Sequence, residues 1–489
     1  MFRRVSLQAA PLAIAAAMLA ASAVAEPWGA GQEAPATPSL TGLRAAPTLM
    51  GETAEWPQAE APISIDARRA VEAAVREWTN KETRAEGRAR RMDIAAYYAQ
   101  HDYAPLWREG ADFSPAAKSA LQTLHESARD GLRVEAPDKE TRWSVAADLA
   151  LSEAIADYAA QAGGARVDPA KISRLIGARP APATPVQALD AVIGAAGDAG
   201  ARLAAFNPPH AGYVALRDKL AELRAARANA GRVAAAAQTS DATPRANFAT
   251  LSEGESKRVE AEIVANMERW RWIPRELGDT RVEVNIPQFE LMLTRDGKLS
   301  HETRVVVGKT ATPTPIFSDE MQFVAINPSW SVPQSIINKE MAPKGGGDLS
   351  YLAGRGYQVS YRDGRASVRQ PPGDKNALGR VKFVFPNDFA VYMHDTPSKS
   401  FFANAKRAYS HGCVRVDQPF KLAETVLGAD YGEKRLRGMV GPAERRINLS
   451  QPMPVHIEYF TAVVDANGAL KLYDDVYGYS AKVRAALAL

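Results

Sequence analysis

The spacing of hydrophobic positions changes along the chain and divides it into regions. From Ile65 to about residue 228, alanine and leucine abound and apolar residues recur at the spacing of a helix. This pattern predicts an all-α domain at 63–228. Its expected helices cover about 66–80, 115–128, 143–161, 186–197 and 211–228.

A polar stretch rich in alanine, threonine and serine predicts a linker over 229–252. A helix is expected between Glu253 and Trp272, and Pro274 would stop it. The next stretch alternates polar and apolar residues in the manner of strands, which predicts a mostly-β domain over 253–475 and a tail over 476–489. The fold class expected is therefore α+β with several domains.

Several β elements can be placed within that domain. Asp296-Gly297 and Asn467-Gly468 predict hairpin turns. Strands are expected over 282–286, 289–293, 304–307, 322–326, 381–385 and 389–393. The residues over 338–376 include a probable small hairpin at Asp363-Gly364, and they predict an insertion long enough to cap a site.

The N-terminus has the pattern of an export signal. Arg3 and Arg4 precede an apolar run, and small residues follow before Glu26, so we expect a signal peptide at 1–25 and a periplasmic protein. A retained membrane anchor is the alternative. Residues 26–62 read as a flexible Pro/Ala-rich segment. The formal charge of +4 falls to +2 without the two arginines, and charge alone therefore indicates no nucleic-acid partner.

Cys413 is the only cysteine in the chain. In an oxidising compartment, cysteines that stabilise folds come in pairs, so an unpaired one suggests a reactive thiol or an intermolecular bond. The alternative is a buried cysteine that serves as a small apolar side chain. Its polar flanks, Ser410-His411-Gly412 and Arg415, favour a nucleophile.

Two histidines compete for the role of base. His411 lies two residues from the thiol and could approach it only if the backbone turns, whereas His394 comes from another segment, so His394 is favoured. Gly412 permits close approach of a substrate carbonyl to backbone N–H groups, including that of Cys413. Arg415 could bind a substrate carboxylate or pair with a protein acid.

The stretch Ser410-His411-Gly412-Cys413-Val414-Arg415-Val416, preceded by His394-Asp395-Thr396, resembles the signature of the L,D-transpeptidases with a YkuD-type catalytic domain. The stretches at 327–333, 376–383 and 268–274 resemble large periplasmic members of that family. The resemblance implies a β-sandwich catalytic domain and, before it, a helical scaffold domain. One departure is that residues 229–252 leave no room for the peptidoglycan-binding module that many large relatives carry.

The resemblance also implies a reaction. Cys413 would form a thioester with a peptidoglycan tetrapeptide stem, with His394 as base, and a second stem would then give a 3→3 cross-link. Neither metal nor cofactor is expected. Positions that would line the site are Tyr392, Ser410, His411, Gly412, Arg415 and Trp330.

Other readings stay open from the sequence. Water as acceptor would make the protein an L,D-carboxypeptidase or hydrolase, and a lipoprotein lysine would make it an envelope tether. A second class is a cell-wall scaffold without turnover. Expected partners are peptidoglycan stem peptides and other cell-wall synthesis proteins, and carbapenems are expected to acylate Cys413.

Overall fold

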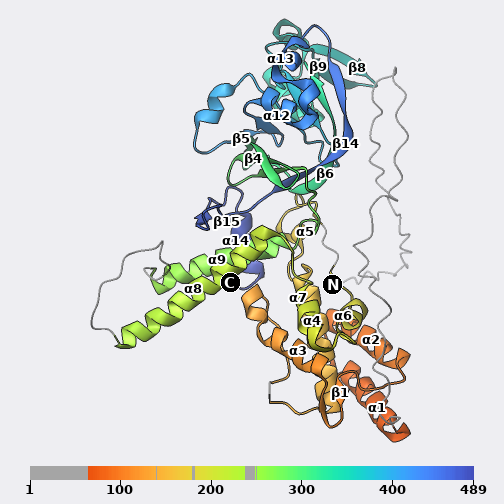
Figure 1. The fold of residues 1–489 in the computed structure, drawn as a ribbon. Helices are drawn as coiled ribbons and strands as arrows, with labels where there is room; N and C mark the ends of the chain where they lie inside the picture. The colour runs from red at the N-terminus through yellow and green to blue at the C-terminus, as the bar shows by residue number, and fades with distance from the viewer. Residues whose placement is uncertain (1–63, 139, 179–181, 237–247, 249–250) are drawn as a thin grey trace, which may run out of the picture. The chain divides into compact units, whose positions relative to one another are not determined.

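The computed structural model describes residues 64–138, 140–178, 182–236, 248 and 251–489 (Figure 1). The predicted signal peptide at 1–25 and the segment at 26–62 lie outside the described residues. Within the described ranges, no helix has the length and apolar character needed to cross a bilayer.

The region before residue 237 is helical, as expected. Its helices are α1 (Ile65–Lys81), α2 (Ala85–Gln100), α3 (Pro115–His125), α4 (Val145–Ala162), α5 (Pro169–Ile172), α6 (Pro185–Val192), α7 (Ala199–Ala204) and α8 (Ala211–Ala236), with a small hairpin of β1 (Arg108–Glu109) and β2 (Asp112–Phe113). Serine side chains cap α1, α3 and α4 at their N-termini. The predicted helices near 66–80, 115–128, 143–161 and 211–228 are thus confirmed. The helix predicted over 186–197 ends at Val192, and α2 was not predicted.

Two predicted boundaries differ from the structure. Helix α8 runs on to Ala236, inside the stretch 229–252 that was expected to be a linker. The expected tail at 476–489 contains helix α14 (Tyr479–Ala486), whose Val483 is fully buried. Helix α8 as a whole packs along α9 (Glu253–Trp270), and α14 also contacts α9.

Helix α9 joins the helical region to the β domain. Ser252 and Glu255 form a capping box at its start. On one side Arg224 and Arg227 of α8 pair with Glu260. On the other, the Trp270 ring stacks on Phe460, with 4.3 Å between ring centroids. The helix that was assigned to the β domain is therefore shared by both regions.

The β domain is built on one mixed sheet. Its strands are β3 (Arg281–Asn285), β4 (Glu290–Arg295), β5 (Lys298–Gly308), β6 (Phe317–Ile326), β10 (Val381–Val384), β11 (Met393–His394), β12 (Ala408–Ser410), β13 (Val414–Val416) and β14 (Arg445–Glu458). They lie in the order β12-β5-β13-β11-β10-β6-β14-β3-β4, and β4 also pairs with β5. The sheet therefore folds back on itself and encloses a core.

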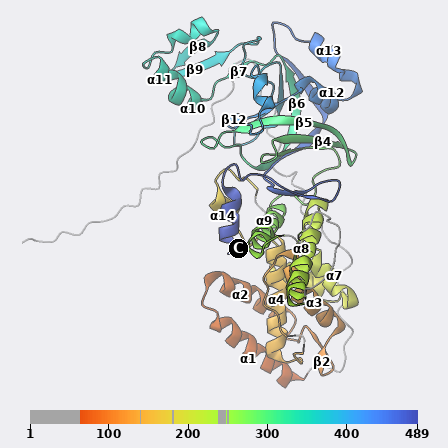
Figure 2. The same cartoon turned by 90° about the vertical axis from the view of Figure 1, so that its left-hand side faces the viewer.

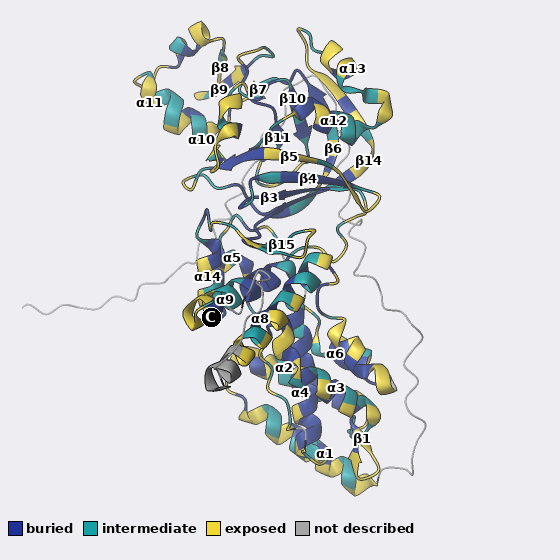
Figure 3. Cartoon of the chain, turned by 60° about the vertical axis from the view of Figure 1, so that its left-hand side comes forward, coloured by how far each residue is buried: buried dark blue, intermediate teal, exposed yellow. Residues whose placement is uncertain are grey.

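Alternation along the strands fills that core. Val282, Val284, Leu291 and Leu293 are fully buried, as the period of two predicts (Figure 3). Helices α12 (Pro419–Leu427) and α13 (Glu433–Gly438) follow β13. The hairpin turns at 296–297 and 467–468 are confirmed, the second between β15 (Ala462–Val464) and β16 (Leu470–Leu472).

The predicted strand at 389–393 is wrong for most of its length. Only Met393 of that range belongs to β11. Ala390 has a left-handed backbone with φ of 52°. The Asn387 side chain accepts from the N–H groups of Phe389 and Val391, so a polar side chain holds this segment in a loop.

The insertion is a small unit with a core of its own. It holds the strands β7 (Trp330–Ser331), β8 (Gln358–Arg362) and β9 (Arg365–Gln370), and the short helices α10 (Gln334–Ile336) and α11 (Ala342–Lys344) on either side of a π-helical turn at Ile337–Met341 (Figure 2). Val332 and Val368 are among its buried residues. The cap therefore begins near Trp330, before the expected start at 338, and the predicted hairpin at 363–364 joins β8 to β9.

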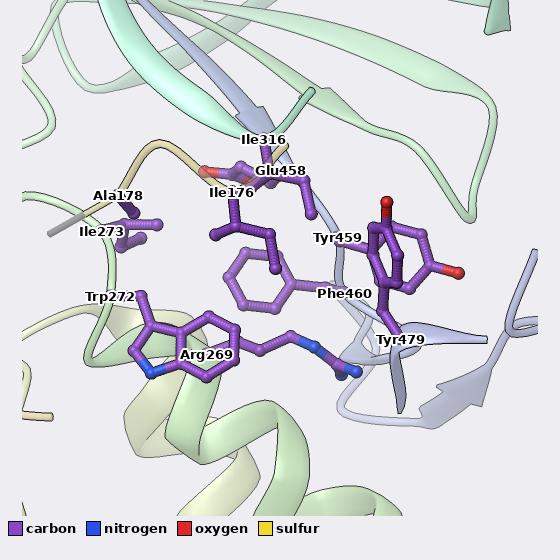
Figure 4. Close-up of a pocket in the computed structure, with 10 residues that line it drawn as sticks. All are labelled: Ile176, Ala178, Arg269, Trp272, Ile273, Ile316, Glu458, Tyr459, Phe460 and Tyr479. Atoms are coloured by element: carbon purple, nitrogen blue, oxygen red, sulfur yellow. The ribbon is translucent and has the colours of Figure 1, made fainter. Parts of the chain in front are cut away.

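A small cavity lies where α9 and α14 meet the end of β14, and none of the predicted site residues lines it (Figure 4). Arg269, Trp272 and Glu458 each place a buried polar atom without a hydrogen-bond partner in this junction. Burial, together with the neighbouring Glu283, raises the pKa of Glu458 well above its usual value.

Buried His456 on β14 makes stability depend on pH. It contacts the Ser318 hydroxyl and the Leu277 carbonyl, and burial lowers its pKa from 6.5 to about 4. Below pH 6.5 the unfolded chain therefore binds a proton that the folded chain does not, and the free energy of unfolding falls. Between pH 7 and pH 5 we expect wild type to lose about 2 kcal/mol more than His456→Gln, from ~1.4 kcal/mol per pH unit. Urea unfolding at both pH values measures the difference, and equal losses would contradict it.

Candidate active site

The sheet brings Cys413 and His394 onto neighbouring strands. Cys413 directly precedes β13, which runs parallel to β11 with Met393 opposite Val414 and His394 opposite Arg415. The Val414 N–H donates to the Tyr392 carbonyl at 3.2 Å and extends this register to the start of both strands. Because side chains two apart on a strand share a face, Tyr392, His394, Cys413 and Arg415 gather on one side of the sheet.

The His394 imidazole is buried and held by backbone carbonyl groups. Its Nδ1 is hydrogen-bonded to the Asp395 carbonyl. Burial first, and then the positive charge of Arg415, lower the pKa of His394 to about 3. The ring is therefore neutral at pH 7. Among the hydrogen bonds of the described residues none joins it to the Cys413 sulfur, so the base assignment stays a prediction.

A tight turn presents the thiol. Ser410 is buried, and its hydroxyl donates to the Cys413 carbonyl at 2.5 Å and accepts from the Gly412 N–H at 3.1 Å. Gly412 has φ of 119°, a conformation that L side chains rarely adopt. The Thr314 hydroxyl donates to the Gly412 carbonyl at 2.8 Å. Since the Gly412 N–H is already used, it is not free to bind an oxyanion.

The backbone N–H of Cys413 itself is available. It makes no hydrogen bond within the part of the chain that the structure describes. An N–H beside a nucleophile is the group that stabilises a tetrahedral oxyanion. The Cys413 N–H is therefore free for the predicted role of oxyanion donor, which stays a prediction.

The thiol lies among polar groups even though burial raises its pKa. Tyr392, through its N–H and its hydroxyl, and the positive charges of Lys382 and Arg415 act in the opposite direction. The Tyr392 ring also meets the His394 ring edge-on, with centroids 5.6 Å apart. At rest the group is a thiol, surrounded by donors and cations that favour its ionised form.

Arg415 offers a charge that the protein leaves unused. Its Nε is buried without a partner, and no acid within the described residues forms an ion pair with it. Its guanidinium lies 6.0 Å from the centre of the Phe401 ring. Of the two roles left open by the sequence, the binding of a substrate carboxylate is the one that this geometry favours.

His411 points to the cap instead. Its Nε2 lies 2.5 Å from Glu340 on the π-helical turn and 3.4 Å from the Lys309 ammonium. Trp330 at the start of the cap lies near the Tyr392 phenol, next to β11. His411 therefore connects the cap to the cysteine loop and is engaged away from the thiol.

Two residues of this site were not predicted. Lys382 on β10 stands opposite His394, and its ammonium lies 3.9 Å from the centre of the Tyr392 ring. Buried Asp395 accepts from the N–H groups of Arg380 and Thr396. Lys382 is half-buried between buried Val381 and Phe383, and a lysine between two apolar strand residues was the available signal for it.

The backbone at Gly379 packs so closely against the Asp395 side chain that only glycine fits there. Its φ is 61°, and a Cβ atom would lie 2.4 Å from the Asp395 side chain. We expect Gly379→Ala to lower the free energy of unfolding by roughly 2–4 kcal/mol, from backbone strain and displaced packing. Urea unfolding measures this, with Gly254→Ala as a control because nothing lies within 4 Å of a Cβ there. An unchanged free energy of unfolding in Gly379→Ala would contradict this prediction and show that the loop makes room for the added Cβ atom.

A mostly-β domain with a cysteine and a histidine on one face of neighbouring strands fits the class of acyl-transfer domain that the motifs resemble. The family comparisons agree with this class. Residues 279–457 match the L,D-transpeptidase catalytic domain, YkuD, and residues 92–220 match the scaffold domain. These two matches confirm the resemblance and the α+β fold class.

One curated relative comes from Haemophilus influenzae and is provisionally named an L,D-transpeptidase. It is 31% identical over 258 residues, which cover 48% of this chain and 51% of the relative. The chain thus spans about half the length of the curated relative that it matches.

Solved L,D-transpeptidases show more distant likeness. One from Mycobacterium smegmatis is 14% identical with a TM-score of 0.21, over 37% of this chain and 58% of that protein. One from Enterococcus faecium is 16% identical with a TM-score of 0.19, over 42% and 64%. A third, from Mycobacterium tuberculosis in complex with a faropenem-derived adduct, is 11% identical with a TM-score of 0.20, over 37% and 60%. Scores this low add nothing to the family match.

Proposed function

We propose that this protein is a periplasmic, cysteine-dependent L,D-transpeptidase that forms 3→3 cross-links in peptidoglycan. The observation that carries the proposal is the shared face of β11 and β13, where Cys413, His394 and the unpaired Arg415 converge inside a matched catalytic domain. The predicted export signal supports the periplasmic location.

The first half of the reaction forms a thioester. The Cys413 sulfur attacks the carbonyl carbon of the third stem residue while the neutral His394 ring takes the thiol proton. The Cys413 N–H stabilises the negative oxygen that develops. As the bond to the terminal D-alanine breaks, the proton passes from His394 to the leaving nitrogen. The free amino acid departs, and the acyl group stays on sulfur.

The second half transfers that acyl group. An amine on a second stem attacks the thioester, a C–N bond forms, the C–S bond breaks, and the thiol regains its proton. The energy of the first amide is kept in the thioester, so the proposed reaction needs no ATP and no metal. We infer that Arg415, whose Nε has no partner, binds a carboxylate of the stem peptide, and that the cap from Trp330 onwards borders the donor side.

The competing functions differ in the acceptor. Water would yield shortened monomers, as in an L,D-carboxypeptidase, and a lipoprotein lysine would yield a tethered protein. A scaffold without turnover would leave the stems unchanged. Arg415 beside the thiol favours turnover, because its buried Nε has no hydrogen-bond partner and such an atom is costly to keep in a purely structural domain.

Purified peptidoglycan incubated with the full-length protein tests the proposal. Muropeptide analysis should show dimers joined between the third residues of two stems, together with released D-alanine. Shortened monomers alone would support the hydrolase, and an unchanged profile would overturn catalysis. A carbapenem adduct on Cys413, seen in the intact mass, gives an independent readout of the nucleophile.

A further inference from the structure

Lys382 is an unpaired cation on the same face as the thiol. It lies on β10 opposite His394 of β11, and Arg415 of β13 completes the row. Its ammonium lies 3.9 Å from the centre of the Tyr392 ring, a cation–π contact. No carboxylate within the described residues lies at ion-pair distance from it; Glu444 acts on its charge only at longer range.

Removing the Lys382 ammonium from water costs free energy, and no ion pair with an acid of the described residues offsets this cost. Burial lowers the pKa of Lys382, and the negative charge that Cys413 can carry acts to raise it. The interaction is mutual, because Lys382 also lowers the pKa of the thiol. A half-buried lysine that faces an ionisable sulfur and has no acid partner at ion-pair distance is placed to meet a negative charge that forms during the reaction.

His394 is poorly suited to supply the positive countercharge for a Cys413 thiolate. Its imidazole is buried between carbonyl groups and close to the charges of Arg415 and Lys382. A standing imidazolium would be a third cation on one face of the sheet. A thiolate there needs a countercharge that is already present before the proton moves.

We propose that Lys382 supplies the countercharge for the Cys413 thiolate, with Arg415 kept for the substrate. Lys382 is then a positioning residue that acts through the ionisation of Cys413, and the role rests on the proposed function of that cysteine. During acylation the proton passes from sulfur to the neutral His394 ring as the S–C bond forms, so no lasting imidazolium is required. The groups around the sulfur are Tyr392 just before β11, His394 from β11, Lys382 from β10 and Arg415 from β13.

The test is the pH dependence of Cys413 alkylation by iodoacetamide in the full-length protein, followed by intact mass. This small neutral reagent reads the thiolate without any carboxylate or acceptor. We expect K382M to move the midpoint upward by about one pH unit and to slow alkylation about tenfold at pH 7. K382R should stay close to wild type because it keeps the charge. K298M removes the same charge from the exposed β4–β5 hairpin and should change nothing.

The outcomes separate the roles. A shifted midpoint in K382M, restored in K382R, supports the countercharge. A wild-type midpoint in a K382M protein of normal melting temperature overturns it, even if transpeptidation is lost. Should K382M unfold at the assay temperature, K382Q keeps a polar end and gives the same comparison. Alkylation needs no stem peptide, so its result is independent of whether the muropeptide assay finds cross-links.

Discussion

Replacing Cys413 with alanine is expected to reduce acyl transfer by about four orders of magnitude or more, because the nucleophile of a covalent mechanism has no substitute. Cys413 is the only cysteine in the chain, so no second thiol can take over. The measurements are release of D-alanine from a tetrapeptide stem and the mass of the protein after incubation with a carbapenem.

The serine variant is the matched partner of that experiment. Cys413→Ser keeps the side-chain volume and the turn that Ser410 and Thr314 hold. Loss of turnover in both variants, with melting temperatures like wild type, attributes the effect to sulfur. Alanine protein that still releases D-alanine at the wild-type rate would place the chemistry elsewhere.

The second large effect concerns the base. We expect His394→Gln to slow acylation about 10²–10⁴-fold, the usual contribution of a positioned general base. His411→Gln should change acylation by less than about tenfold, because His411 is held by Glu340 on the cap rather than by the thiol. Acylation by a carbapenem, followed by stopped-flow or by mass, compares the two variants directly.

A neutral His394 also predicts how the reaction rate depends on pH. His394 has a pKa of about 3, so its loss of a proton does not shape the rate between pH 5 and 8. Activity in that range should instead rise with pH as the thiol ionises, since burial raises the pKa of Cys413. A rate that falls to half at pH 6.5 in wild type and no longer does so in His394→Gln would contradict a buried, neutral imidazole.

Much of the fold was predictable because the apolar positions that the sequence pattern assigns to the core are buried in the structure. The helices α1, α3 and α4 begin at serine caps and keep an apolar face, and both signals are visible in the sequence. Strands β4 and β5 flank the turn that Asp296-Gly297 predicted. Where a polar side chain overrides the pattern, as Asn387 does before β11, the prediction of a strand over 389–393 was wrong.

Contacts between distant segments were less predictable. Helix α8 extends to Ala236 alongside α9, and α14 is helical where a tail was expected. Helix α14 packs on α9, and this contribution is absent from any single stretch of sequence.

The sequence by itself determined which residues can carry chemistry here. It contains one cysteine, a histidine nineteen residues before it, and a glycine beside the thiol. Residue type and spacing were enough for this, because a nucleophile and a base are recognisable by their side chains.

Only the tertiary structure decided how those residues are arranged. The parallel pairing of β11 and β13 puts His394 and Cys413 on one face, turns His411 toward Glu340, and adds Lys382 from β10. Strand order and register arise from the whole sheet, which joins segments far apart in the chain. The charges around the thiol depend on that register, and for this reason they could not be read from the motif alone.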